Sequence, residues 1–179
     1  KAKKWLFGTV GMAVISAAIF SLLQSGDYVV APESMYSTTT NFLKHVGETF
    51  KIETTFVDAS NAEAYAAAVR PNTKMFWVES PSNPLLRITD ISEVAAIGKR
   101  AGAITVVDNT FATPFNQRPL ELGADLVIHS GTKFLDGQGR VMAGAICGSR
   151  ELIEGVFAPL MRTAGMVLAP FNAWVVHKG

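Results

Sequence analysis

The sequence predicts an α/β fold, a mostly parallel β-sheet with helices on both faces. Short apolar runs typical of strands alternate with helical segments about six or seven times. Two of these runs, residues 104–107 and 126–128, are mostly apolar and rich in β-branched residues, as in strands buried on both faces. Both runs stop abruptly in polar residues, and open α/β sheets bind ligands at such strand ends.

The first half of the chain contains clear boundary signals for its elements. Gly26 is suited to a left-handed helix end, and Pro32 stops the strand that precedes it. Asn61 or Ser60 can cap the third helix. In chain order we expect an apolar opening segment at residues 5–10, a buried helix at 11–24, a strand at 27–31, a helix ending near 46, a strand at 51–57 and a helix at 61–69.

The second half repeats the pattern. Thr89 and Asp90 are capping residues, and Gly102 ends the helix that they begin. Residues 136–140 are glycine-rich, which predicts a flexible link. We expect strands at 73–79, 104–108, 125–129 and 141–147, helices at 90–101 and 120–123, and a further helix from residue 150.

Composition excludes several classes of protein. The 179 residues suffice for one domain with a sizeable core, and 49% hydrophobic with 17% charged residues is unlike a disordered chain. A net charge of +1 gives no strong attraction to nucleic acid. The lone Cys147 excludes an internal disulfide framework, and the scattered histidines argue against a metal site. We expect a cytoplasmic protein without metal.

A membrane segment is the main alternative near the N-terminus. Residues 5–23 carry no charge and follow a lysine-rich start, which suits a signal anchor or a bilayer-spanning helix. Against this, Gly8, Thr9 and Gly11 interrupt the run, and the later part is rich in alanine and serine. The pattern alone leaves both interpretations open.

Reactive side chains follow four of the predicted strands. They are Tyr36, Glu79 with Asn83, Asp108, and Ser130 with Thr132 and Lys133. Since parallel strands end at one edge, these groups should gather there, facing the positive end of the helix that Gly11 opens. An amine near a carboxylate and hydroxyls suits a lysine Schiff base with pyridoxal phosphate (PLP). A solvated turn at Lys133 and a helix-capping role for Asp108 are the simpler alternatives.

Other common cofactor motifs are absent from the sequence. A nicotinamide-type glycine motif is not found, because Gly137 and Gly139 follow no strand and Met142 stands where the third glycine should be. There is also no Gly-x-Ser-x-Gly elbow and no phosphate-loop lysine.

Four longer motifs give a resemblance to a known family. They are Glu-Ser-Pro-Ser-Asn-Pro from residue 79, Asp-Asn-Thr-Phe-Ala-Thr-Pro from 108, Gln-Arg-Pro-Leu-Glu-Leu-Gly-Ala-Asp from 117 and Ser-Gly-Thr-Lys-Phe-Leu-Asp-Gly-Gln-Gly-Arg from 130. In this order they resemble the Cys/Met-metabolism PLP enzymes, over nearly the whole chain. Residues 136–140, 162–165 and 170–174 are most similar to the sulfhydrylases that act on O-succinylhomoserine.

The resemblance implies a fold and a role for each site residue. The chain would be the central part of the large domain of the aspartate aminotransferase-like fold (fold type I), with residues 1–179 as its PLP-binding piece. Lys133 matches the Schiff-base lysine and Asp108 the partner of the pyridine nitrogen. The remaining matches are Tyr36 as the stacking ring that assists proton transfer, Asn83 near the cofactor's phenolic oxygen, and Ser130, Thr132 and the backbone of Gly11 and Met12 around the phosphate.

The resemblance also implies a reaction and an assembly. It implies an amino-acid substrate and γ-replacement in methionine biosynthesis, with sulfide and O-succinylhomoserine giving homocysteine and succinate. Cystathionine γ-synthase activity and methionine or cystathionine γ-lyase activity remain alternatives. Family members form tetramers as dimers of dimers, and the helix from Gly11 is expected at the phosphate rather than in a membrane.

Two departures from the family are visible. Val10 replaces a common serine before the Gly-Met pair, which removes a hydroxyl from the phosphate site. The chain is about half the family's length, so the N-terminal arm and the C-terminal small domain, which carry further arginines of the site, are expected to be missing. A truncated, inactive PLP-fold module is therefore a second hypothesis.

Overall fold

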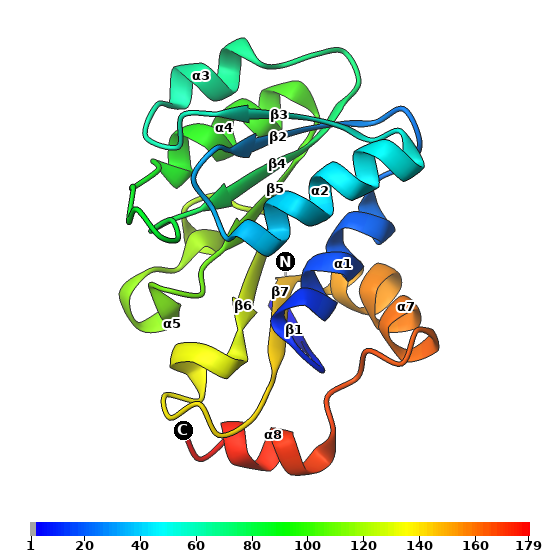
Figure 1. Ribbon diagram of the computed structural model, residues 1–179, viewed down its shortest axis with the longest axis vertical. Helices are drawn as coiled ribbons and strands as arrows, with labels where there is room; N and C mark the ends of the chain where they lie inside the picture. The colour runs from blue at the N-terminus through cyan, green and yellow to red at the C-terminus, as the bar shows by residue number, and fades with distance from the viewer. Residues whose placement is uncertain (1–2) are drawn as a thin grey trace.

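A seven-stranded sheet organises the computed structural model, which describes residues 3–179 (Figure 1). The strand order is β1-β7-β6-β5-β4-β2-β3. The strands are β1 (Lys3–Gly8), β2 (Tyr28–Pro32), β3 (Glu53–Val57), β4 (Thr73–Glu79), β5 (Ile104–Asp108), β6 (Leu126–Ser130) and β7 (Gly144–Ser149). The expected mostly parallel sheet is confirmed, since β7 alone runs in the opposite direction to the other six strands.

Helices cover both faces of the sheet, as predicted (Figure 1). The longer ones are α1 (Gly11–Leu22), α2 (Ser37–Phe50), α3 (Ala62–Ala67), α4 (Ile91–Ala101), α7 (Ala158–Thr163) and α8 (Pro170–Val176). Short turns of helix are α5 (Thr113–Asn116), η1 (Pro119–Glu121), η2 (Gly131–Leu135), α6 (Arg150–Leu152) and η3 (Ile153–Phe157).

The core lies in two layers because side chains alternate along each buried strand. On β4, Met75 and Trp77 join α1, α2 and α7 on one face. Phe76 and Val78 join α3 and α4 on the other face. All four side chains are fully buried, and each large apolar side chain contributes about 1.5–3 kcal/mol by leaving water.

The predicted caps of α3 and α4 are confirmed. The Asn61 side chain accepts a hydrogen bond from the Glu63 amide at 2.9 Å, and Asp90 accepts one from Glu93 at 3.0 Å. Gly102 ends α4 with φ of +68°, a conformation that costs glycine little. These local signals therefore set the boundaries of both helices.

The segment at residues 5–23 differs from a single long helix. It divides into β1, which pairs with β7, and α1, which packs against the sheet. Within residues 3–179 no helix is long and apolar enough to cross a bilayer. Residues 1 and 2 of the lysine-rich start lie outside the described residues. Gly26 does not end α1: Leu23 leaves the helix in an extended conformation, and Gly26 lies in the turn that follows.

The antiparallel strand β7 explains how α1 reaches the site. Because β7 is antiparallel to both β1 and β6, β1 runs in the same direction as β6. The carboxyl end of β1 therefore lies at the edge where β2, β4, β5 and β6 also end, and α1 begins there.

Candidate active site

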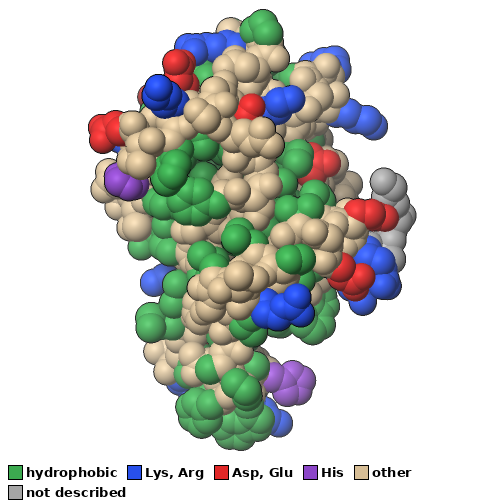
Figure 2. Space-filling model, turned by 90° about the vertical axis from the view of Figure 1, so that its right-hand side faces the viewer, with side chains coloured by type: hydrophobic (Ala, Val, Ile, Leu, Met, Phe, Trp, Pro, Cys, Tyr) green, Lys and Arg blue, Asp and Glu red, His purple; other side chains and the backbone are tan. Residues whose placement is uncertain are grey.

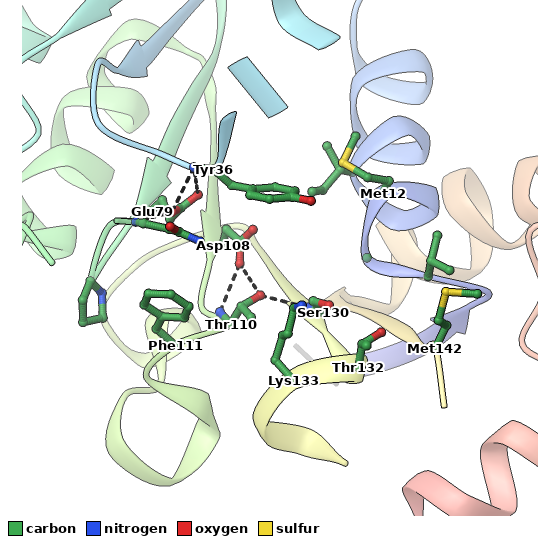
Figure 3. A pocket seen from close by; sticks show the side chains of 15 residues that line it. Met12, Tyr36, Glu79, Asp108, Thr110, Phe111, Ser130, Thr132, Lys133 and Met142 are labelled. Carbon is green, nitrogen blue, oxygen red and sulfur yellow. Dashed lines mark hydrogen bonds between the residues drawn. The ribbon is translucent and has the colours of Figure 1, made fainter. Parts of the chain in front are cut away.

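A cavity of about 360 Å³ lies at this edge of the sheet (Figure 3). Its walls come from the start of α1 and from the segments that follow β2, β4, β5 and β6. The structure brings all the candidate residues together in its lining: Gly11, Met12, Tyr36, Asn83, Asp108, Ser130, Thr132 and Lys133. Their individual roles as ligands and catalysts stay predictions.

Asp108 is a buried carboxylate that lines the cavity. It is the last residue of β5, and its Oδ1 accepts hydrogen bonds from the Thr110 amide at 3.0 Å and the Thr110 hydroxyl at 2.6 Å. Burial raises the pKa of Asp108, and the Thr110 hydrogen bonds oppose that rise only in part. A cation in the cavity would favour the charged carboxylate, so Asp108 fits a partner such as a protonated pyridine nitrogen.

Lys133 lies on an irregular turn directly after β6. The turn η2 has π-helical hydrogen bonding, and Lys133 itself departs from helical geometry with φ −91° and ψ −113°. Its neighbour Thr132 anchors the turn, because its hydroxyl accepts a hydrogen bond from the Ala143 amide at 3.1 Å. The turn thereby holds the lysine at the rim of the cavity, where its side chain is exposed.

The start of α1 closes another side of the cavity. Val10 precedes the helix and makes no side-chain capping hydrogen bond. A Cβ at Gly11 would lie 3.0 Å from the Ser130 Cβ and 3.1 Å from its hydroxyl oxygen. Glycine thus lets the helix terminus and the Ser130 hydroxyl approach closely. A helix N-terminus beside hydroxyl groups attracts anions, which fits a phosphate group.

Tyr36 and Asn83 line the cavity from the segments after β2 and β4. The Tyr36 ring is 40% exposed and extends across the cavity in the direction of Met12 (Figure 3). Both residues are tied through their backbone amides to the carboxylate of Glu79. Burial and the neighbouring Asp108 carboxylate raise the pKa of Glu79 to about 8.

Sequence reasoning missed part of the lining. The strand pattern predicts Glu79 at a strand end without a role, and the motifs that predict the other site residues do not assign one to Thr110. The sequence Asp-Asn-Thr carries a usable signal for Thr110, since an aspartate readily binds the amide two residues later. Other lining residues fill space and have no such signal: Val10, Ile15, Pro81, Phe111 and Met142.

The residues present fit PLP. The helix start and hydroxyls suit its phosphate, the buried Asp108 suits its ring nitrogen, and the Lys133 amine suits its aldehyde. An aromatic ring at Tyr36 offers a flat surface to a planar ligand.

Comparison with known proteins agrees with this fit. The family model described as Cys/Met metabolism PLP-dependent enzyme matches residues 1–179. O-succinylhomoserine sulfhydrylase from Pseudomonas aeruginosa is 46% identical over 169 residues, which cover 94% of this chain and 42% of that protein. Cystathionine gamma-lyase from Bacillus subtilis is 44% identical over 170 residues, which cover 94% of this chain and 44% of that protein.

A solved structure shares the fold. The crystal structure of metB from Corynebacterium glutamicum superposes with a TM-score of 0.94 at 34% identity, over 97% of this chain and 45% of that one. The chain therefore spans less than half the length of each of these three relatives. PLP is the cofactor that this family implies. The chain belongs to the Cys/Met-metabolism PLP-dependent enzymes.

Proposed function

We propose that the chain forms the cofactor-binding region of an enzyme that replaces the γ-substituent of an activated homoserine. The proposed reaction converts O-succinylhomoserine and sulfide to homocysteine and succinate. The observation that carries the proposal is the cavity in which a lysine amine, a buried carboxylate and an anion-attracting helix start meet. The 46% identity to the sulfhydrylase relative supports this choice of reaction.

Each residue has a physical task in this proposal. When bound, PLP supplies an electron sink that stabilises negative charge on the substrate carbons. Asp108 keeps the ring nitrogen protonated because opposite charges favour each other in a dry site. The Lys133 amine would hold the cofactor at its aldehyde group, and as a free amine it would move protons at the substrate's α and β carbons. The α1 terminus, Ser130 and Thr132 hold the phosphate.

The first experiment tests the cofactor. PLP added to the protein that carries this sequence should produce a new visible absorbance band, and Lys133→Ala should abolish it. Lys74→Ala is the matched control, since Lys74 is an exposed lysine on β4 and does not line the cavity. Absence of the band in the unmodified protein would reject the assignment.

γ-Elimination is the second candidate activity. The lyase relative is 44% identical, so identity hardly separates the two reactions. Homocysteine that forms only when sulfide is present supports replacement, whereas a 2-oxo acid and ammonia without sulfide support elimination. Cysteine in place of sulfide tests the cystathionine γ-synthase alternative, which predicts cystathionine as product.

An inactive PLP-fold module, a protein without catalytic activity, is the alternative to an enzyme. It is motivated by the coverage of only 42% of the sulfhydrylase relative. Assays on the 179-residue chain alone address it directly. Turnover by that chain rejects the inactive module, whereas a PLP band without turnover supports it.

The proposal includes assembly into a homotetramer, built as a dimer of dimers. Figure 2 shows hydrophobic side chains gathered at the end of the molecule where α8 lies. Phe171 and Trp174 on α8 are 67% and 59% exposed, which supports association through an apolar surface. Light scattering during size-exclusion chromatography measures the mass, and a monomer at micromolar concentration would contradict this part of the proposal.

A further inference from the structure

Glu79 is a second buried carboxylate beside Asp108. It is the last residue of β4, is 5% exposed and lies in register with Asp108 on the neighbouring parallel strand. Both residues line the cavity. Two carboxylates on adjacent strands at a buried edge repel one another, so the arrangement needs a compensating partner.

The Glu79 carboxylate binds the backbone of two separate segments. Oε1 accepts a hydrogen bond from the Asn83 amide at 2.7 Å. The Tyr36 amide donates to both oxygens, at 3.1 Å to Oε1 and 3.0 Å to Oε2. Hydrogen bonds to a charged acceptor are stronger than neutral ones. Glu79 therefore fixes the segment after β2 and the turn after β4 relative to the same cavity wall.

The carboxylate pair has no cationic partner in the described chain. Among residues 3–179, neither Glu79 nor Asp108 takes part in an ion pair. Their hydrogen-bond donors are neutral backbone amides and the Thr110 hydroxyl. The charge of this wall is therefore balanced either by a proton on one carboxylate or by a cationic group that enters the cavity, such as the protonated ring nitrogen of the cofactor.

We propose that Glu79 is a positioning residue for the cofactor, which holds the backbones of Tyr36 and Asn83 at the cavity and supplies a second negative charge beside Asp108. The inference rests on the proposed PLP site and deepens it. It assigns Glu79 two separable tasks, a geometric one through hydrogen bonds and an electrostatic one through its charge. Burial, and after it the repulsion from Asp108, raises the pKa of Glu79.

Two substitutions separate these tasks. Glu79→Gln keeps the size and one acceptor oxygen but removes the charge. Glu79→Asp keeps the charge but shortens the side chain. Glu53→Gln is the control, because Glu53 is an exposed carboxylate on the edge strand β3 and binds Arg70 there.

The measurements are the dissociation constant for PLP and the pH midpoint at which the visible band of the PLP-bound protein changes. We expect Glu79→Gln to weaken PLP binding about 10-fold, as lost charge-assisted hydrogen bonds do. Its midpoint should fall by about half a pH unit or more, because a nearby negative charge stabilises the protonated form. Glu79→Asp should keep the midpoint near that of the unmodified protein.

The outcomes distinguish this inference from the proposed function. A band in the unmodified protein with an unshifted midpoint in Glu79→Gln overturns the role of Glu79 and leaves the PLP site standing. If Glu79→Asp shifts the midpoint as much as Glu79→Gln does, the charge is not the cause and the inference is also overturned. No band in the unmodified protein overturns the proposed function together with this inference.

Discussion

The Thr110 hydroxyl oxygen lies 2.6 Å from Asp108 Oδ1 and donates its hydrogen to that carboxylate. The same oxygen accepts a hydrogen bond from the Ser130 amide at 2.8 Å. One side chain thus links the end of β5, where Asp108 lines the cavity, to the end of β6, which leads into the turn η2 that carries Lys133 (Figure 3). This link predicts that loss of the Thr110 hydroxyl lowers the stability of the fold and also disturbs the position of Asp108 in the cavity.

Thr110→Val should weaken both the fold and the site. It keeps the shape but leaves the Ser130 amide without this acceptor, which costs about 1–3 kcal/mol of the free energy of unfolding. PLP binding should weaken as well, because Asp108 loses a donor that orients it. Urea unfolding and PLP titration measure the two effects. Thr110→Ser retains the hydroxyl and should behave nearly as the unmodified protein does.

Gly11→Ala should disturb the anion-binding end of the cavity. The added Cβ would lie about as close to Ser130 as tight contacts allow, at 3.0 Å from its Cβ. We expect weaker binding of PLP and of inorganic phosphate, by about 10-fold, while the helix itself gains from alanine. Gly155→Ala is the control, since a Cβ there meets nothing within 4 Å. Equal affinities in the two variants would show that the close approach at Gly11 does not matter.

The carboxylate pair predicts a pH dependence of stability. The pKa of Glu79 rises from 4.5 to about 8 on folding, so the folded protein binds this proton more tightly than the unfolded one. The stabilising contribution is complete below about pH 4.5 and is lost as pH rises through about 8. Each pKa unit corresponds to about 1.4 kcal/mol, which gives a loss of a few kcal/mol.

Urea unfolding of the PLP-free protein across this pH range measures the effect. Glu79→Gln cannot titrate, so its free energy of unfolding should change less with pH than that of the unmodified protein. The difference between the two curves isolates the contribution of Glu79 from that of the remaining groups. Parallel curves would contradict a raised pKa of Glu79 in the folded protein.

The Asp136–Arg140 pair predicts that the glycine-rich segment after η2, the turn that carries Lys133, contributes to the stability of the fold. The Asp136 side chain is fully buried and accepts hydrogen bonds from Arg140 Nε at 3.0 Å and Nη2 at 2.7 Å. Arg140 Nη2 also donates to the Val175 carbonyl at 3.2 Å, which connects α8 to this segment.

Arg140→Ala should therefore lower the free energy of unfolding more than the loss of an exposed ion pair does, because it leaves the Asp136 carboxylate without its partner. Arg150→Ala is the comparison, since the exposed Arg150–Glu154 pair contributes at most about 0.5 kcal/mol. Thermal unfolding of both variants measures the difference. Similar unfolding temperatures would mean that Asp136 finds other partners.

The strands and helices of the parallel part could be predicted because their signals are local. The alternation of apolar runs, the caps at Asn61 and Asp90, and Gly102 as a helix end depend only on nearby residues. The expected strand at 73–79 coincides with β4. The candidate residues also share a simple position, at the ends of parallel strands, which is why they could be chosen from the sequence.

Other features depended on contacts between distant segments. Residues 5–8 of the opening segment belong to β1 only because β7 offers a pairing edge, and that pairing brings α1 to the cavity. The glycine-rich segment at 136–140 was expected to be flexible, whereas the buried Asp136–Arg140 pair holds it. The partner strand of β1 cannot be recognised from local sequence, because hydrogen bonding between segments depends on where the rest of the chain lies. Asp136 and Arg140 are close in sequence, but the Val175 carbonyl that also binds Arg140 is 35 residues away.

The sequence by itself determined the fold class, the family and the set of residues at the strand ends. It did so because hydrophobic periodicity and short motifs depend only on residues that are close together in the sequence. The tertiary structure alone decided which groups touch: Glu79 with the amides of Tyr36 and Asn83, and Thr110 between Asp108 and Ser130. Those contacts join residues up to 43 positions apart. They depend on the register of neighbouring strands, which is fixed only when the sheet has formed.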